Sequence, residues 1–133
     1  MANTTNTTNG GAGISRAAPA LEDAAATVAA ENCREMAEVR AEIDRLDRVL
    51  VRLIAERTGY IEAAARIKPA LDDVRVPWRI EDVVEKVVRE AEAVGLPARI
   101  AEPVWRELIE RSIEHEAIVW RSIRSLSDGN SEA

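Results

Sequence analysis

Two cationic residues, Arg57 and Lys68, have a spacing that would let them act together on an anion. Lys68 follows Arg57 by eleven positions, which is close to three turns of an α-helix at about 3.6 residues per turn. On a helix they would share one face with Ile61 and Ala64. A guanidinium and an ammonium on one face can bind carboxylates, although most such side chains on helices are simply solvated.

Arg40 is a third candidate, but a single helix cannot bring it to that face. It precedes Arg57 by seventeen residues, which is roughly 25 Å on a helix that rises about 1.5 Å per residue. An antiparallel copy of the same helix could supply it instead. The spacing therefore suggests a dimer whose pockets are shared between two chains.

A long amphipathic helix from Glu38 to Lys68 is expected to position these cations. It has no proline or glycine before Gly59, and Pro69 ends the pattern. Apolar residues recur at the three- and four-residue intervals typical of a helix with one buried face. They are Ile43, Leu46, Leu50, Leu53 and Ile54.

Two further helices are predicted downstream. The second begins near Pro77 and ends before Gly95, because proline favours the first helical position and glycine the position after the last. The third runs from about Ile100 to Leu126, with Pro103 tolerated only in its first turn. The loop between the first two helices, residues 69–77, is either a lid over a pocket or an ordinary connector. Three helices predict an all-α bundle.

The two ends of the chain lack this pattern. Residues 1–20 are predicted to be a disordered N-terminal tail, because they offer few large apolar groups to offset the entropy of ordering. The alanine-rich stretch 21–30 could be helical, and Asn32 is a possible helix cap. Residues 33–126 are expected to form the helical domain, and residues 127–133 a disordered C-terminal tail.

Composition narrows the classes of function. The chain has 133 residues, a net charge of −6 and a pI near 4.9, which argues against nucleic acid as a partner. No apolar run is long enough for a membrane span, and the N-terminus does not resemble a signal peptide. We therefore expect a cytoplasmic protein that uses no membrane partner. One cysteine, Cys33, and one histidine are too few for a usual zinc site. Cys33 is therefore interpreted as an inert thiol, and His115 as a structural or surface residue.

Three segments resemble the all-helical chorismate mutases and their relatives, the isochorismate pyruvate lyases. VRAEIDRLDRVLVRLIAERTGYIEAAARIK is similar to the first helix of that family, VPWRIEDVVEKV to the start of the second and AVGLPARIAEPVWRELIERSIEHEAIVW to the third. The likeness covers residues 35–125. It includes Arg40, Arg57, Lys68, Arg79 and Glu116 at the spacing of the family. The resemblance implies a three-helix subunit in an intertwined homodimer.

The first interpretation is chorismate mutase, which rearranges chorismate to prephenate and needs no cofactor, metal or nucleophile. The resemblance implies that Arg57 and Arg40 of the partner subunit clamp the two carboxylates of this small dianionic substrate. Negative charge grows on the ether oxygen as its C–O bond breaks, so Lys68 and Glu116 would stabilise it there. Arg79 would add positive potential, and Ser112 would bond the ring carboxylate.

Three positions depart from the pattern common in these mutases. Val76 and Ile80 occupy places where many members carry acidic residues that bind the C4 hydroxyl of chorismate. Apolar residues there are more similar to the lyases, whose substrate has its hydroxyl at C2. Glu116 stands where many members have glutamine, and a carboxyl group donates a hydrogen bond only when protonated.

Other interpretations remain open. The closest alternative is isochorismate pyruvate lyase, which forms salicylate and pyruvate. A second is a mutase of 4-amino-4-deoxychorismate. A third, from a different class, is a non-catalytic helical dimer that regulates another enzyme. The third is less favoured, because all the cations expected in the pocket are present.

Overall fold

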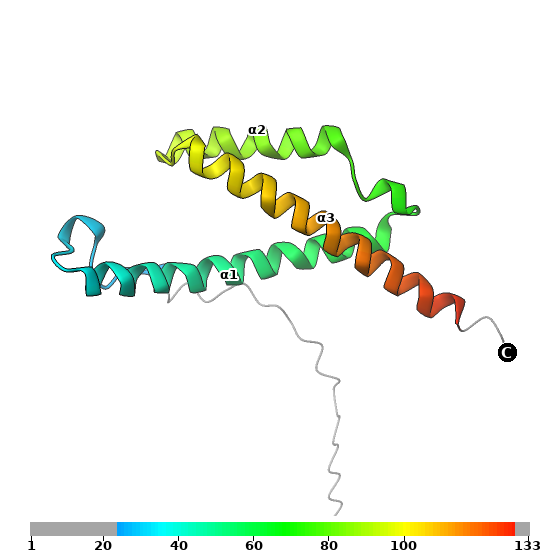
Figure 1. The fold of residues 1–133 in the computed structure, drawn as a ribbon, viewed down its shortest axis with the longest axis horizontal. Coiled ribbons are helices and arrows are strands. Elements are labelled where there is room, and N and C mark those ends of the chain that lie inside the picture. Colours follow the sequence, from blue (N-terminus) through cyan, green and yellow to red (C-terminus); the bar gives the residue numbers. More distant parts are fainter. Residues whose placement is uncertain (1–23, 130–133) are drawn as a thin grey trace, which may run out of the picture. The chain divides into compact units, whose positions relative to one another are not determined.

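The computed structural model describes residues 24–129, and every regular element in that range is helical (Figure 1). The order is a short 3₁₀ turn η2 (Ala30–Asn32), α1 (Met36–Ile67), a second 3₁₀ turn η3 (Leu71–Asp73), α2 (Pro77–Val94) and α3 (Ala98–Asp128). The chain divides between Glu56 and Arg57 into two compact units. The predicted all-α architecture with a long first helix is confirmed.

The first unit contains the N-terminal part of α1 and the segment before it. Glu42 on α1 accepts hydrogen bonds from the backbone N–H groups of Thr27 and Val28, each at 3.2 Å, and from Arg45 Nε at 2.8 Å. These donors lower the pKa of Glu42, with Arg45 as the main cause. The carboxylate thus holds the preceding segment against the helix.

Two expectations for this region were inaccurate. The described part of the alanine-rich stretch, residues 24–30, contains no α-helix. Asn32 lies in η2 rather than capping α1, which begins four residues later at Met36. The stretch is not followed directly by α1 because a 3₁₀ turn and an extended residue, Cys33, intervene. The predicted tail of residues 1–20 lies outside the described residues.

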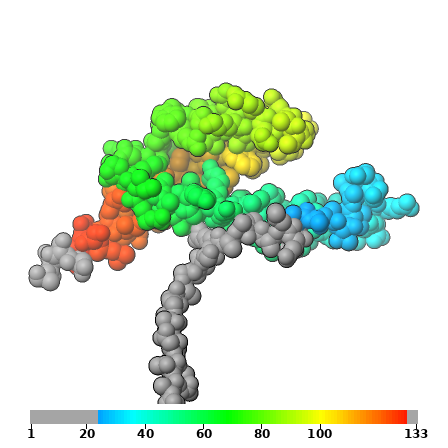
Figure 2. All heavy atoms as spheres, turned by 180° about the vertical axis from the view of Figure 1, so that it is seen from behind, coloured from blue at the N-terminus to red at the C-terminus, as the bar shows by residue number. Residues whose placement is uncertain are grey.

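The second unit brings α2 and α3 side by side with the end of α1. Both views show α2 against α3 (Figure 1 and Figure 2), and η3 also contacts α3. The buried apolar side chains are mostly small, which lets the helices approach closely. They are Ala65, Val74, Val84, Ala91, Ala101 and Ile109.

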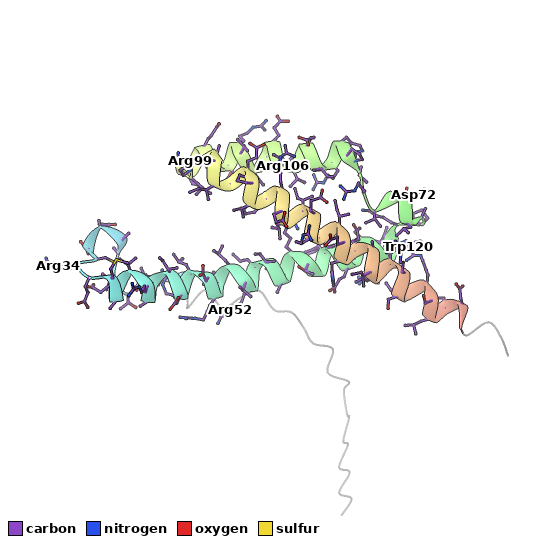
Figure 3. The ribbon with its side chains drawn as sticks, in the orientation of Figure 1. Arg34, Arg52, Asp72, Arg99, Arg106 and Trp120 are labelled. Atoms are coloured by element: carbon purple, nitrogen blue, oxygen red, sulfur yellow. The ribbon has the colours of Figure 1, made fainter. Side chains whose placement is uncertain are left out.

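Two bidentate ion pairs join the elements of the second unit at its surface. Arg75 donates to both oxygens of Glu110, at 2.9 and 2.7 Å, and so ties the loop after η3 to α3. Arg106 donates to both oxygens of Glu81 on α2, at 3.0 and 3.1 Å, and Figure 3 shows Arg106 between these helices. Paired guanidinium and carboxylate groups fix the orientation of the two elements as well as their contact.

The predicted bounds of the second helix are confirmed, and those of the third need a small correction. α3 begins at Ala98, two residues before the predicted start, because Pro97 takes the capping position. Pro103 is therefore the sixth helical residue and lies beyond the first turn, where it removes one backbone hydrogen bond. α3 also includes Ser127 and Asp128, which the sequence assigned to the tail. None of the described helices is long and apolar enough to cross a membrane.

Gly95 ends α2 in a left-handed conformation that other residues adopt at a cost. Its φ is 77°, and its N–H and that of Leu96 bond back to carbonyls of the last turn. A Cβ at Gly95 would meet nothing within 4 Å, so strain in the backbone is the only penalty. Gly95→Ala should lower the free energy of unfolding by about 1 kcal/mol, measured by chemical denaturation.

Gly129→Ala is the matched control for this change. Gly129 follows α3 with a φ of −67°, which alanine adopts freely, so the variant should be at least as stable as the parent. Equal losses in the two variants would show that backbone conformation does not explain the requirement for Gly95.

Candidate active site

One pocket in the second unit is lined by residues from all three helices. Its volume is about 380 Å³, within the range usual for small-molecule sites. The end of α1 supplies one wall, α2 and the loop before it a second, and α3 a third. The lining residues are Arg57, Ile61, Ala64, Lys68, Val74, Val76, Trp78, Arg79, Ile80, Val83, Ile109, Ser112, Ile113 and Glu116.

Arg57 is a half-buried cation with no carboxylate partner among the described residues. Its Nη1 donates a hydrogen bond to Ser112 Oγ at 3.0 Å, and that hydroxyl donates in turn to the carbonyl of Leu108 at 2.7 Å. Burial lowers the pKa of Arg57, and the positive charge of Arg79 lowers it further. An anion that enters the pocket would therefore stabilise the charged guanidinium.

Lys68 and Glu116 form an ion pair in the lining of the pocket. Lys68 Nζ lies 2.9 Å from Glu116 Oε1, and the Glu116 side chain is only 4% exposed. The approach lies outside hydrogen-bonding geometry, so Oε1 has a charge partner but no aligned donor within the described residues. Lys68 Nζ also donates to the carbonyl of Val74 at 3.4 Å. The pair therefore retains hydrogen-bonding capacity for a ligand.

Arg79 lines the pocket from the first turn of α2, but its guanidinium has a partner. Its Nη1 lies 2.5 Å from Asp82 Oδ2, which also accepts from Lys86 Nζ at 3.0 Å. These two hydrogen bonds, from Lys86 and then Arg79, lower the pKa of Asp82. The side chain of Arg79 is 55% exposed, so it can turn from Asp82 to a stronger anion without losing a buried contact.

The α2 wall of the pocket is apolar at the two positions that depart from the common mutase pattern. Val76 caps α2 without a side-chain hydrogen bond, and Ile80 follows one turn later. Trp78 lies between them in sequence and lines the pocket while remaining 72% exposed. This wall offers no side-chain acceptor for a ligand hydroxyl.

The structure brings together seven of the eight site residues that the sequence suggested. Arg57, Lys68, Arg79, Ser112, Glu116, Val76 and Ile80 all line the pocket. Arg40 is exposed on the part of α1 that belongs to the first unit, and it is not among the lining residues.

Sequence reasoning missed Trp78, whose place beside Pro77 at a helix start could have indicated a pocket edge. It also missed Trp120 and Arg124, which contact the backbone around Lys68. Their signal is spacing, because Glu116, Trp120 and Arg124 follow at four-residue intervals on one helix. His115 places Nε2 3.1 Å from Glu62 Oε1, and it is not among the residues that line the pocket.

Ser112 accepts a hydrogen bond from Arg57 and donates one to the Leu108 carbonyl. Neither partner is a general base, so the arrangement does not activate Ser112 as a nucleophile. The pocket instead combines fixed cations with an apolar wall. Such a site can bind a compact anion and stabilise negative charge that develops on it during a reaction.

Comparison with known proteins supports this reading. The family model for chorismate mutase type II matches residues 39–117, a range that includes Arg40 and every residue lining the pocket. The isochorismate pyruvate lyase of Pseudomonas aeruginosa is 31% identical over 94 residues, covering 71% of this chain and 93% of that protein.

Lys68→Met should destabilise the protein, because it leaves the buried Glu116 carboxylate without its counter-charge. Loss of one partner from a buried pair costs about 3 kcal/mol or more. Chemical denaturation of the parent and the variant near pH 7 measures the loss.

Lys86→Met is the control for this prediction. Lys86 is 63% exposed in its pair with Asp82, so its removal should cost less than about 1 kcal/mol. A loss in Lys68→Met no larger than that of the control would contradict a structural role for the Lys68–Glu116 pair.

Proposed function

Because this chain belongs to the chorismate mutase type II family, we propose that it acts on isochorismate and releases salicylate and pyruvate. The alternative within the same family is the rearrangement of chorismate to prephenate. Both substrates carry two carboxylates, a diene ring and an enolpyruvyl ether, so the same set of cations serves either reaction. The α2 wall is what favours isochorismate.

The net charge of the pocket lining is the main observation that supports an anionic substrate. Its lining includes three cations, Arg57, Lys68 and Arg79, and one carboxylate, Glu116. Two positive charges therefore remain, which is the number that a dicarboxylate neutralises. Arg57 has no acidic partner among the described residues, so it is the natural ligand for one carboxylate.

The apolar residues Val76 and Ile80 distinguish between the two substrates. The hydroxyl of chorismate is on C4, and burying it against an apolar wall without an acceptor costs about 1 to 3 kcal/mol. Isochorismate has its hydroxyl on C2, beside the ring carboxylate that Ser112 would bond. The 31% identity to an isochorismate pyruvate lyase supports the same choice.

The elimination needs little from the protein beyond position and charge. The C3–O bond breaks, the hydrogen on C2 passes to the methylene carbon of the departing enolpyruvyl group, and the ring becomes aromatic. The reaction consumes no water, oxidant or base, because the carbon that gives up the hydrogen and the carbon that receives it belong to the same substrate molecule. Lys68 meets the ether oxygen as it becomes negative, and Glu116 aids there when protonated.

The proposal includes a homodimer in which Arg40 of the partner subunit completes each pocket. The apolar side chains of α1 before Arg57 are open to solvent in the single chain, with Leu46 46%, Leu50 51% and Leu53 46% exposed. A continuous apolar face of this kind normally marks an interface. A two-fold axis would bury it on both chains at once and bring each Arg40 towards the other pocket.

The direct test is to incubate the purified protein separately with isochorismate and chorismate and to identify products by mass spectrometry. We expect salicylate and pyruvate from isochorismate, at a kcat/KM higher than that for prephenate formation. Faster turnover of chorismate would replace the lyase with the mutase. Turnover of neither would favour the non-catalytic dimer.

Ile80→Asp tests the role of the wall in this choice. An acceptor at this position can bind the C4 hydroxyl, so the ratio of kcat/KM for chorismate to that for isochorismate should rise by about 10-fold. Ile80→Val keeps the wall apolar and should leave the ratio unchanged. A rise in both variants, or in neither, would mean that the α2 wall does not select the substrate.

Complementation between two inactive variants tests the shared pocket. Arg40→Ala and Arg57→Ala should each lose activity, and an equal mixture should recover about a quarter of the parental turnover after subunit exchange, because half of the dimers then contain one native pocket of two. A mixture of Arg57→Ala with Lys68→Ala is the control, and it should recover nothing. Exchange without recovery in the first mixture would argue against sharing.

A further inference from the structure

The end of α1 is held by side chains of α3 instead of by a backbone cap. The last carbonyls of a helix have no partner inside it, and a glycine after the helix usually supplies one. Here Pro69 follows Lys68, and proline has no N–H to donate. The carbonyl groups around Lys68 must therefore find donors elsewhere.

Trp120 and Arg124, one turn apart on α3, provide these donors. Trp120 Nε1 donates to the carbonyl oxygen of Lys68 at 2.9 Å, and Arg124 Nη2 donates to the same oxygen at 2.6 Å. Arg124 Nη1 also reaches the carbonyl of Ala65 at 3.0 Å. Figure 3 shows Trp120 at the place where α3 meets the end of α1.

The geometry of Arg124 makes this a firm attachment. Its guanidinium carbon lies 4.0 Å from the centre of the Trp120 ring, so the ring restrains the group that bonds the carbonyls. A cation at a helix C-terminus also interacts favourably with the helix dipole. The two carbonyls, the guanidinium and the indole thus form one hydrogen-bonded cluster.

Both ends of Lys68 are consequently attached to the same face of α3. Its main-chain oxygen accepts from Trp120 and Arg124, and its ammonium lies 2.9 Å from Glu116 Oε1, one turn earlier. A long, flexible lysine side chain is otherwise poorly located, because its entropy favours many rotamers. Fixing both ends limits where the ammonium can be.

We propose that Trp120 and Arg124 are positioning residues that hold the Lys68 ammonium at the reacting ether oxygen. Neither lines the pocket, so their effect on the reaction passes through Lys68. The effect on turnover rests on the proposed function, whereas the effect on the placement of Lys68 does not. The two can be measured separately.

Lysine-selective labelling measures placement without any reaction. The chain has only two lysines, Lys68 and Lys86, so Lys86 is an internal reference. Limited acetylation with an activated ester, quantified by peptide mass spectrometry, gives the ratio of labelling at Lys68 to that at Lys86. Trp120→Phe replaces the indole with a smaller phenyl ring, which keeps an aromatic face but has no N–H to donate, and Arg124→Met removes the guanidinium. Each should raise the ratio by about 3-fold or more, because local opening exposes the amine.

Arg121→Met is the matched control. Arg121 is exposed on the same helix, and its side chain makes no hydrogen bond or ion pair within residues 24–129. Its labelling ratio should equal that of the parent. Thermal unfolding shows whether each variant is folded. If Arg124→Met is not folded, Trp120→Phe decides the question alone. An unchanged ratio in the folded variants overturns the proposal, whatever the activity of the protein.

Turnover then tests the consequence for the reaction. On whichever of isochorismate and chorismate the parent converts, kcat should fall by about 10-fold or more in Trp120→Phe, with KM within about 3-fold of the parental value, because displacement of a transition-state donor affects chemistry more than binding. A raised labelling ratio with parental kcat overturns the proposal. If the parent converts neither substrate, the proposed function fails, and the labelling ratio still decides whether the two residues position Lys68.

Discussion

The ion pair between Lys68 and Glu116 is the contact on which the rest of the pocket depends. Among the described residues, Glu116 is the charged residue whose side chain is buried. A buried carboxylate requires a cation at close range. The available cation is the residue at which α1 stops. The end of α1 must therefore meet the middle of α3, and this meeting closes one side of the pocket.

α3 organises the site by repeating its contacts once per turn. Ser112 bonds Arg57, Glu116 pairs with the Lys68 ammonium, and Trp120 and Arg124 bond the backbone beside it. Residues four apart share one face of a helix, so one straight element places both cations of α1. The small buried Ala65 leaves room for this close approach.

Patterns within one helix were predictable from the sequence, and contacts between helices were not. The shared face of Arg57 and Lys68 follows from their spacing, and Pro77 and Gly95 mark the ends of α2. Glu116 and Arg79 could be assigned to the same site only through the family resemblance, because spacing along one chain does not say which helices meet. The attachment of Lys68 by Trp120 and Arg124 joins residues more than fifty positions apart. In the sequence alone, Trp120 and Arg124 fit the pattern of an ordinary amphipathic helix. Their role becomes visible only when the position of the end of α1 is known.

Affinity and selectivity have separate physical origins in this pocket. Burial lowers the pKa of Arg57, and repulsion from Arg79 lowers it further. Asp82 offsets part of the positive charge by pairing with Arg79. Under the proposed function, chorismate and isochorismate would remove that repulsion equally, because both are dicarboxylates, so the cations would distinguish them poorly. Discrimination has to come from an uncharged part of the ligand, and the hydroxyl is the group whose position differs. Under the proposed function, the apolar residues Val76 and Ile80 of the pocket lining, rather than the cations, would select between the two substrates.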